Sequence, residues 1–330
     1  MNRRSFVTAV GGAAVSATAP ALVAPHRIGM TDVVQLQTRF AGLIASDHRH
    51  GGQEAIETHA VALAREALEL QQHGSASQRV RDSIYACAAG FMSSAMWAAI
   101  DGRRFQAAED HHERAAKLAL MSGDQTIQFR IWSHAGSLYR HMRRPADALA
   151  TNDVTRNLGL TRRDPLFASL GHARQAAIHG LTGDANAVRR SIDRAQESLD
   201  RAQPDRPRPV WLTTHYDQAE LDSLALAAYL ALGRYEDAEA QAHRSLALLR
   251  PHMRRSQAIT SARLARAQLG QGDVEPAVTT AMSIPRPLAA HPRVSGMLRG
   301  FGATLSTVAG DSEHTRTWHQ FAQDTGRISA

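Results

Sequence analysis

A chain of 330 residues is long enough to fold around a sizeable core. Apolar residues make up 43% of it but aromatic residues only 5%, so alanine and leucine must supply most of the packing, which disfavours a β-sandwich. The formal charge is +7, yet the arginines are interspersed with acidic residues, which indicates a solvated helical surface and argues against a nucleic-acid-binding tail. The single cysteine, Cys87, excludes a disulfide or a cysteine-based zinc site within the chain.

Residues 1–29 have two interpretations. Arg3 and Arg4 precede a weakly apolar stretch with an Ala-x-Ala site that ends at Ala21, which is the pattern of a twin-arginine export signal. The same residues also fit a flexible linker of small side chains. The stretch is too rich in Gly, Ala, Ser and Thr to predict a stable membrane span.

From Met30 onward the sequence predicts one helix after another. Apolar residues recur at three- and four-residue steps, as in EAIETHAVALAREALELQ (54–71). The predicted helices stop at short polar turns that contain glycine, for example MSGDQ (121–125) and LTGD (181–184). Glycine is expected there in the left-handed conformation that closes a helix end. No segment alternates in the manner of a strand, so the predicted fold class is all-α.

A repeated unit is visible around HAGSLYRHMRRPADALA (134–150). Trp132, Gly136, Tyr139 and Ala148 are spaced as positions 4, 8, 11 and 20 of a tetratricopeptide repeat. Small residues at 8 and 20 let two antiparallel helices approach, and bulky residues at 4 and 11 fill the space beside them. The residues at position 20 of the five units are Ala108, Ala148, Val188, Ala238 and Ala277. These anchors predict a tetratricopeptide-like helix-pair solenoid, a right-handed superhelix, over residues 30–330.

One step of the repeat is longer than the others and contains QPDRPRPV (203–210). Its three prolines cannot continue a helix. We expect an exposed loop there, inside one array. A boundary between two subdomains is the alternative.

No catalytic pattern stands out in the sequence. It contains no H-E-x-x-H, no G-x-S-x-G, no P-loop and no dinucleotide fingerprint. In DHRHGG (47–52), His48 and His50 are two residues apart, which suits one face of a strand, but they fall at a predicted helix end, where the helix dipole favours cationic histidine. We therefore predict no enzyme activity, no metal and no cofactor.

The predicted solenoid presents a concave surface lined by the first helix of each unit, at positions 2, 5, 9, 12 and 13 of the repeat. The predicted partner-binding residues are Trp97, Arg130, Ser133, Ser137, Arg140, His141 and Arg266. Arginines and a tryptophan in a groove suit an extended peptide with acidic groups or a free carboxylate. The alternative is that these side chains are solvated or bridge neighbouring repeats.

Several stretches together resemble a family of actinobacterial regulators. They are NRRSF (2–6), DHRHGG (47–52), ELDSLALAAYLALGRYEDAEAQAHRSLALL (220–249) and RRSQAITSARLARAQLGQGDVEPAV (254–278). Those proteins have a Cro/C1-type helix-turn-helix domain followed by a tetratricopeptide sensor array, and an RR-x-F stretch often lies between the two. The resemblance concerns the repeat region, and no helix-turn-helix motif is found in this chain, so direct nucleic-acid binding is not expected.

The resemblance and the repeats together predict a cytoplasmic, non-enzymatic module that binds a protein or peptide, is able to dimerise with a second copy, and regulates transcription indirectly as a sensor or adaptor. One alternative is a binding protein exported by the twin-arginine pathway. Another is a DNA-binding regulator whose true start lies upstream of Met1.

Overall fold

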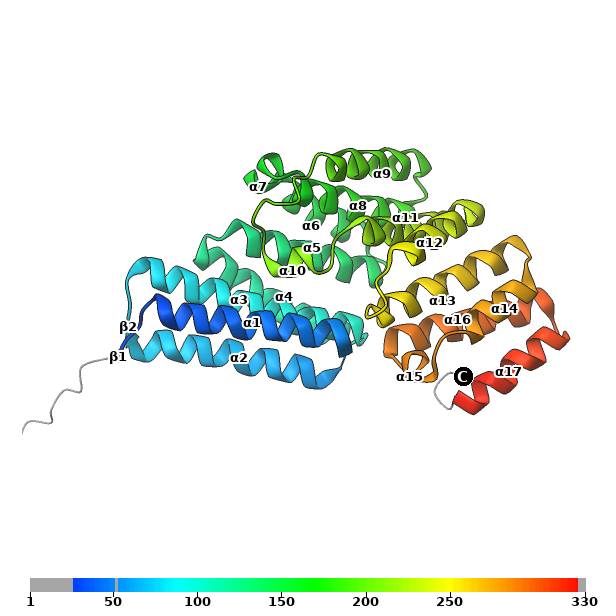
Figure 1. Cartoon of the computed structure of the whole chain (residues 1–330), viewed down its shortest axis with the longest axis horizontal. Coiled ribbons are helices and arrows are strands. Elements are labelled where there is room, and N and C mark those ends of the chain that lie inside the picture. The colour runs from blue at the N-terminus through cyan, green and yellow to red at the C-terminus, as the bar shows by residue number, and fades with distance from the viewer. Residues whose placement is uncertain (1–25, 51–52, 326–330) are drawn as a thin grey trace, which may run out of the picture.

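The structure is a computed structural model that describes residues 26–50 and 53–325. The fold is all-α, as the sequence predicted, with seventeen helices in the described ranges (Figure 1). The only strands there are β1 (His26–Arg27) and β2 (Gly74–Ser75), which pair in parallel. The predicted export signal, with Arg3, Arg4 and the site at Ala21, lies outside the described residues.

The helices follow one another with short connections. Their bounds are α1 Met30–His50, α2 Glu54–His73, α3 Gln78–Asp101, α4 Phe105–Ser122, α5 Gln125–His141, α6 Pro145–Asn157, α7 Gly159–Arg163, α8 Pro165–Thr182, α9 Ala185–Asp200, α10 Val210–Thr213, α11 Gln218–Leu232, α12 Tyr235–Leu248, α13 Arg254–Gln271, α14 Val274–Met282, α15 Arg286–Ala289, α16 Pro292–Ala309 and α17 Glu313–Thr325.

Most of the long helices pack as consecutive pairs: α3 with α4, α5 with α6, α8 with α9, α11 with α12, α13 with α14, and α16 with α17. The first helix of each pair also contacts the first helix of the next pair, from α3 through α5, α8, α11 and α13 to α16. Each of the second helices α4, α6, α9 and α12 also contacts the first helix of the next pair. Figure 1 shows α9 at the upper edge of the molecule. At the N-terminal end, α1 and α2 pack on α3, and α1 also reaches α10 and α13.

The five anchor residues are alike in their burial and in the backbone conformation of the residue five positions before them. Each anchor lies in the second helix of a pair and is fully buried. Five residues before each anchor the backbone adopts a positive φ, at Arg103, Arg143, Gly183, Gly233 and Gly272. The predicted glycine turns thus close three of these first helices, and arginine takes the strained conformation in the other two.

Small residues allow close approach between helices. A Cβ added at Gly136 in α5 would lie 3.5 Å from the Ala148 carbonyl oxygen of α6. A Cβ at Gly180 in α8 would lie 2.7 Å from the Ala228 carbonyl oxygen of α11, closer than real side chains come. Alanine and glycine therefore set the distance within a pair and between pairs.

The chain is non-helical from residue 201 to residue 209, the region of the three prolines. Arg208 ties this loop to the N-cap of α8, because its Nε lies 3.0 Å from Asp164 Oδ2 and both side chains are buried. Asp164 also accepts a hydrogen bond from the Leu166 backbone N–H at 3.0 Å, which satisfies a free donor at the start of α8. The loop then leads into α10, whose Trp211 enters the core.

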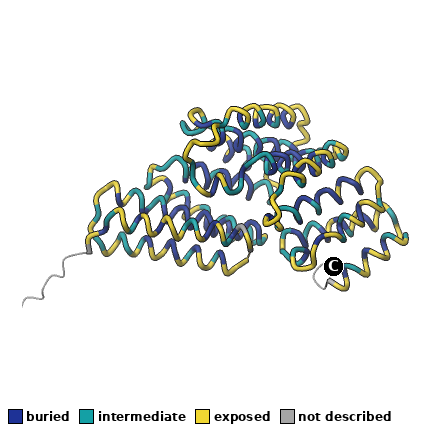
Figure 2. The backbone as a smooth tube through the Cα atoms, in the orientation of Figure 1, coloured by how far each residue is buried: buried dark blue, intermediate teal, exposed yellow. Residues whose placement is uncertain are grey.

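Buried residues lie where the helices face one another, and exposed residues lie on their outer turns (Figure 2). In the described part of the chain, α3 is the one helix long and apolar enough to cross a membrane, and 78% of its apolar window is buried within the protein. Its neighbours α1, α2, α4 and α5 account for that burial, so α3 is the central helix of the N-terminal core.

The positive φ at the helix ends predicts opposite effects of the same substitution at two glycines. Gly233 has φ 72° and Gly300 lies exposed inside α16, and neither has an atom within 4 Å of an added Cβ. Gly233→Ala should lower the free energy of unfolding by about 1–2 kcal/mol through backbone strain. Gly300→Ala should raise it by about 0.5–1 kcal/mol through helix propensity. Urea titrations of both variants check this, and shifts of the same sign would contradict it.

Candidate functional site

A cavity of about 130 Å³ lies where the first helices of successive pairs converge. Its walls come from α1, α3, α5, α8, α10, α11, α13 and α16 and the segments that join them. The charged side chains among them are Asp47, Asp101, Arg130, Arg140, Arg174, Asp217, Glu220, Arg255, Arg263 and Arg293. Six arginines thus face four carboxylates, an excess of two positive charges when the histidines are neutral.

The structure brings six of the seven predicted partner-binding residues to this cavity. They are Trp97, Arg130, Ser133, Ser137, Arg140 and His141. The seventh, Arg266, is exposed on α13 and does not line the cavity; Arg263, about one turn earlier in the same helix, lines it instead. The seven predicted residues therefore do not form one surface.

Arg130 has mainly a packing role, which matches the alternative that such residues bridge neighbouring helix pairs. It is buried, and its Nη atoms donate to the Gly90 carbonyl oxygen and to Ser94 Oγ of α3, both at 3.0 Å. Its guanidinium also lies 4.9 Å from the ring centre of Phe40 and 5.8 Å from that of Trp211. Burial lowers the pKa of Arg130 to about 9, so it stays protonated at neutral pH.

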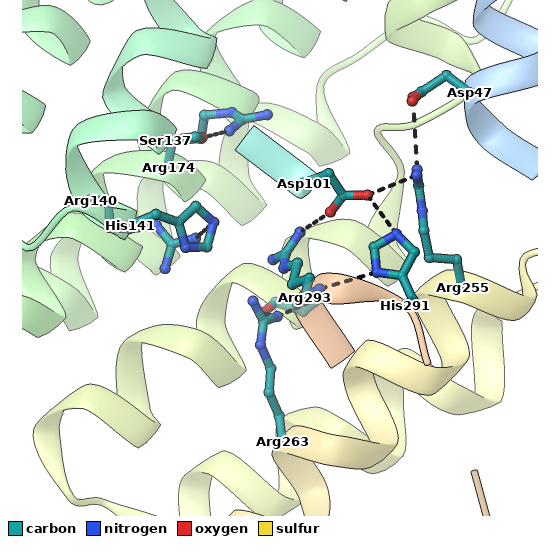
Figure 3. Close-up of polar contacts among 11 residues, drawn as sticks. Asp47, Asp101, Ser137, Arg140, His141, Arg174, Arg255, Arg263, His291 and Arg293 are labelled. Atoms are coloured by element: carbon teal, nitrogen blue, oxygen red, sulfur yellow. Dashed lines mark hydrogen bonds and ion pairs between the residues drawn. The ribbon is translucent and has the colours of Figure 1, made fainter. Parts of the chain in front are cut away.

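A second group of residues forms what we call the Asp101 clasp, which consists of Asp101, Arg255, His291 and Arg293 (Figure 3). Asp101, at the end of α3, has a fully buried side chain 2.9 Å from Arg255 Nη1, 3.3 Å from His291 Nε2 and 3.3 Å from Arg293 Nη1. The clasp joins residues 154 and 192 positions apart. Burial alone would raise the pKa of Asp101, but its three partners outweigh burial and hold the pKa well below the usual range.

Asp47 of α1 stands beside the clasp. Its Oδ2 lies 3.8 Å from Arg255 Nη2, and burial raises its pKa despite that arginine. Together Asp47 and Asp101 connect the N-terminal helices to α13 and α16. The cavity is thus closed on one side by an ionic contact between the two ends of the chain.

Three arginines on the other walls lack an ion pair of this kind, although the charge of Glu220 acts on all three. Arg140 of α5, Arg174 of α8 and Arg263 of α13 form no ion pair with a carboxylate in the described structure. Arg263 Nη1 donates instead to the Ser223 carbonyl oxygen and Oγ, both at 3.0 Å, and Arg174 hydrogen-bonds Ser137. Figure 3 shows the Arg140, Arg263 and Arg293 side chains extending from three different helices toward one region.

Burial is the main cause that lowers the pKa values of these three arginines. Repulsion between arginines adds to it at Arg140 and Arg263, whereas at Arg174 the charge of Glu220 opposes it. Burial, followed by repulsion from Arg293 and Arg174, lowers the pKa of Arg140 to about 9. Burial and the charges of Arg293 and Arg140 likewise lower the pKa of Arg263 well below its usual range. Burial raises the pKa of Glu220, although the positive charges of Arg174, Arg263 and Arg293 oppose that rise. These shifts describe a cationic site that favours an added anion.

Two histidines of the cavity are held neutral. Burial and the charges of Arg130 and Arg174 bring the pKa of His134 well below 6.5. Burial and Arg140 do the same for His141. His134 Nδ1 lies 3.1 Å from Ser93 Oγ, and its ring stacks on Trp97 with 4.7 Å between centres.

The described residues contain no cluster of three or more His, Cys, Asp or Glu side chains arranged to hold a metal ion. The side chains of His48 and His50, which the sequence made a weak candidate, lie outside the described set. Cys87 is buried, and burial raises the pKa of its thiol to about 11, which leaves it protonated at neutral pH.

Some cavity residues that the sequence analysis did not name occupy positions that the repeat register could have identified. When each anchor is counted as position 20, Asp101 falls at position 13 and Glu220 at position 2, which are both groove positions. Arg174 and Arg263 both fall at position 6, which the register did not assign to the groove. The repeat register could not identify Arg255 and Arg293, because neither occupies a groove position. They reach the cavity only because distant parts of the chain pack together.

Comparison with protein-family models finds no match to this chain, and comparison with curated proteins finds no significant match either.

The Asp101 clasp predicts a large loss of stability when its carboxylate is removed. Asp101→Asn leaves three buried basic side chains around a neutral group, and we expect the free energy of unfolding to fall by about 3–5 kcal/mol. Asp205→Asn is the matched control, because Asp205 is exposed in the loop before α10, and it should change stability by at most about 0.5 kcal/mol. Urea titration measures both, and equal shifts would contradict the role of the clasp.

The neutral histidines predict a loss of stability in acid. Their folded-state pKa lies below the unfolded value of 6.5, so stability is full above that pH and falls as the unfolded chain takes up protons. Between about pH 7 and pH 5 each histidine should account for about 2 kcal/mol of that loss.

We expect His134→Gln and His141→Gln to make stability less dependent on pH in this range. His243→Gln on α12 is the control, because that side chain is exposed. The comparison with wild type cancels the opposite contributions of Asp47 and Glu220, whose pKa values are raised by burial. An unchanged pH dependence in both variants would show that neither histidine is held neutral.

Proposed function

We propose that this chain is a tetratricopeptide-like α-solenoid that acts without catalysis, by binding an anionic group of a peptide or protein partner. In this proposal it serves in the cytoplasm as a regulatory sensor or adaptor linked to transcription control. The observation that carries the proposal is the convergence of first-helix side chains from six successive pairs on one arginine-lined cavity.

The solenoid interpretation is supported by the regularity of the helix pairs. Five buried anchors, each preceded at the same distance by a residue with positive φ, give five equivalent turns between paired helices. The first helices contact one another in order along the chain. Such stacking presents first-helix residues of several units to one concave side.

The binding interpretation is supported by the chemistry and size of the cavity. Guanidinium groups are suited to carboxylate and other oxyanions, because they offer parallel donors in a fixed plane. About 130 Å³ is well below the volume of a typical ligand pocket, so one terminal or side-chain group of a partner enters and the rest of it stays outside. A neighbouring hollow of about 630 Å³, which shares Trp211 with the cavity, offers surface for the adjoining residues of a peptide.

The sensor role is supported by the position of the clasp beside the binding site. Arg293 both lines the cavity and binds Asp101 at 3.3 Å. An anion in the cavity attracts the same guanidinium, so occupancy alters the contact between α3 and α16. Ligand binding would thereby change how the two ends of the chain meet, which is a signal that a partner protein can detect. This fits the resemblance to regulators with a tetratricopeptide sensor array.

The experiment compares two substitutions with the same change of charge. Immobilised wild-type protein is exposed to short random-sequence peptides with free C-terminal carboxylates, and retained peptides are identified by mass spectrometry. Arg140→Glu reverses a charge in the cavity and should abolish retention. Arg266→Glu reverses an exposed charge outside the cavity and should leave retention unchanged.

Circular dichroism of both variants establishes that they remain helical. Equal retention by Arg140→Glu and wild type would overturn the assignment of the binding site. The absence of any retained peptide with the wild-type protein would overturn the peptide-binding function.

A further inference from the structure

The cavity collects buried polar atoms that have no partner. Among the described residues, eight buried side-chain nitrogen and oxygen atoms lack a hydrogen bond, and four of them belong to residues of the cavity wall. These four atoms are Asp47 Oδ1, Ser133 Oγ, Arg174 Nε and Trp211 Nε1. Native proteins leave few such groups unpaired, and their concentration in one place indicates a missing ligand.

Most of the unpaired atoms are donors. Arg174 Nε and Trp211 Nε1 can only donate, and the Ser133 hydroxyl can donate as well. They belong to three different elements of the cavity wall, α8, α10 and α5. A ligand that satisfies them must offer several acceptor oxygens pointing in different directions.

The net charge of the cavity wall indicates the charge of the ligand that would neutralise it. The excess of two positive charges calls for a group with two negative charges. Four arginines of the wall, Arg130, Arg140, Arg174 and Arg263, form no ion pair with a carboxylate in the described part of the chain. Arg130 is held by Gly90 and Ser94, and the other three lie on three different helices. A planar carboxylate has two oxygens and one charge, whereas a phosphoryl group has three free oxygens in a tetrahedral arrangement and close to two charges at neutral pH.

The size of the cavity fits a group of this kind. Its volume of about 130 Å³ resembles that of an engineered cavity that holds one benzene molecule, so a compact group fits and a chain segment does not. Arg130 is held by Gly90 and Ser94, and Arg255 by Asp101 and Asp47. Arg140, Arg174 and Arg263 hydrogen-bond the uncharged side chains of His141, Ser137 and Ser223, so a charged acceptor can compete for their donors.

We propose that the cavity is a recognition site for one phosphoryl group, held by Arg140, Arg174 and Arg263 with Ser133 and Trp211 as additional donors. The inference rests on the proposed function in taking this cavity as the binding site, and it names the chemistry of the group that enters. The phosphoryl group is carried either by a phosphorylated side chain of a peptide or by a small phosphate monoester.

Isothermal titration calorimetry with the full chain tests the proposal. The probes are one short peptide with a central phosphoserine, the same peptide with serine or glutamate at that place, O-phospho-L-serine and inorganic phosphate. We expect a phosphorylated probe to bind at least about tenfold more tightly than the glutamate peptide, since charge-assisted hydrogen bonds are gained.

Three substitutions in the cavity wall test the location of the site, and a fourth, outside the cavity, is the control. Arg174→Gln and Arg263→Gln should each weaken binding of the phosphorylated probe by about tenfold or more, the loss of one charge-assisted hydrogen bond. Arg266→Gln is the control and should bind as wild type does. Ser133→Ala should weaken binding while leaving the free protein at least as stable as wild type, because the variant removes a buried hydroxyl that has no partner. A merely structural role for Ser133 would not give this combination.

The pH dependence provides a second test. The second pKa of a phosphate monoester is near 6, so affinity for the phosphorylated probe should fall by about tenfold per pH unit below that value if only the dianion binds. Sulfate keeps its charge across this range and serves as the control oxyanion. A phosphate affinity that does not change between about pH 7 and pH 5 would overturn recognition of a dianion.

The outcomes separate this inference from the proposed function. Binding of the glutamate peptide as tightly as the phosphoserine peptide overturns the phosphoryl inference and leaves peptide binding standing. Binding of O-phospho-L-serine or inorganic phosphate without the phosphopeptide supports the phosphoryl site and overturns the peptide function. Loss of binding in Arg266→Gln to the same degree as in Arg174→Gln overturns the location of the site.

Discussion

The structure depends on one buried carboxylate. Asp101 ends the central helix of the N-terminal core and receives Arg255 and Arg293 from helices near the other end of the chain. A stack of helix pairs has contacts mainly between neighbours, so its two ends have no inherent reason to meet. The Asp101 clasp supplies a contact between these ends, together with the packing of α1 on α13, and it lies in the wall of the cavity.

The fold tolerates the buried arginines because small residues carry the packing elsewhere. Ala108, Ala148 and the other anchors let each pair of helices approach closely without large side chains, and Gly180 does the same between α8 and α11. That leaves space for the long arginine side chains in the wall of the cavity. Their burial has an energetic cost, which the depressed pKa of Arg140 and Arg263 expresses.

Sequence reasoning succeeded where the signal is local and periodic. The all-α class follows from apolar spacing, and the glycines of the predicted turns at 121–125 and 181–184 do adopt positive φ at Gly123 and Gly183. Six of the predicted groove residues line the cavity, because a helical register places them on common faces of α3 and α5. Arg266, at position 9 of its unit, does not line the cavity, whereas Ile259 at position 2 and Arg263 at position 6 of the same helix do.

The sequence by itself determined the helices, the turns between them and the positions of the small residues that bring them together, because each of these depends on residues close in the chain. Only the tertiary structure decided that Asp47, Asp101, Arg255 and Arg293 meet, since more than a hundred and fifty residues separate Asp101 from Arg255. It also decided that Arg140, Arg174 and Arg263 share one space without a carboxylate to pair them. Charge compensation is a property of positions in space, and no local pattern in the chain records it.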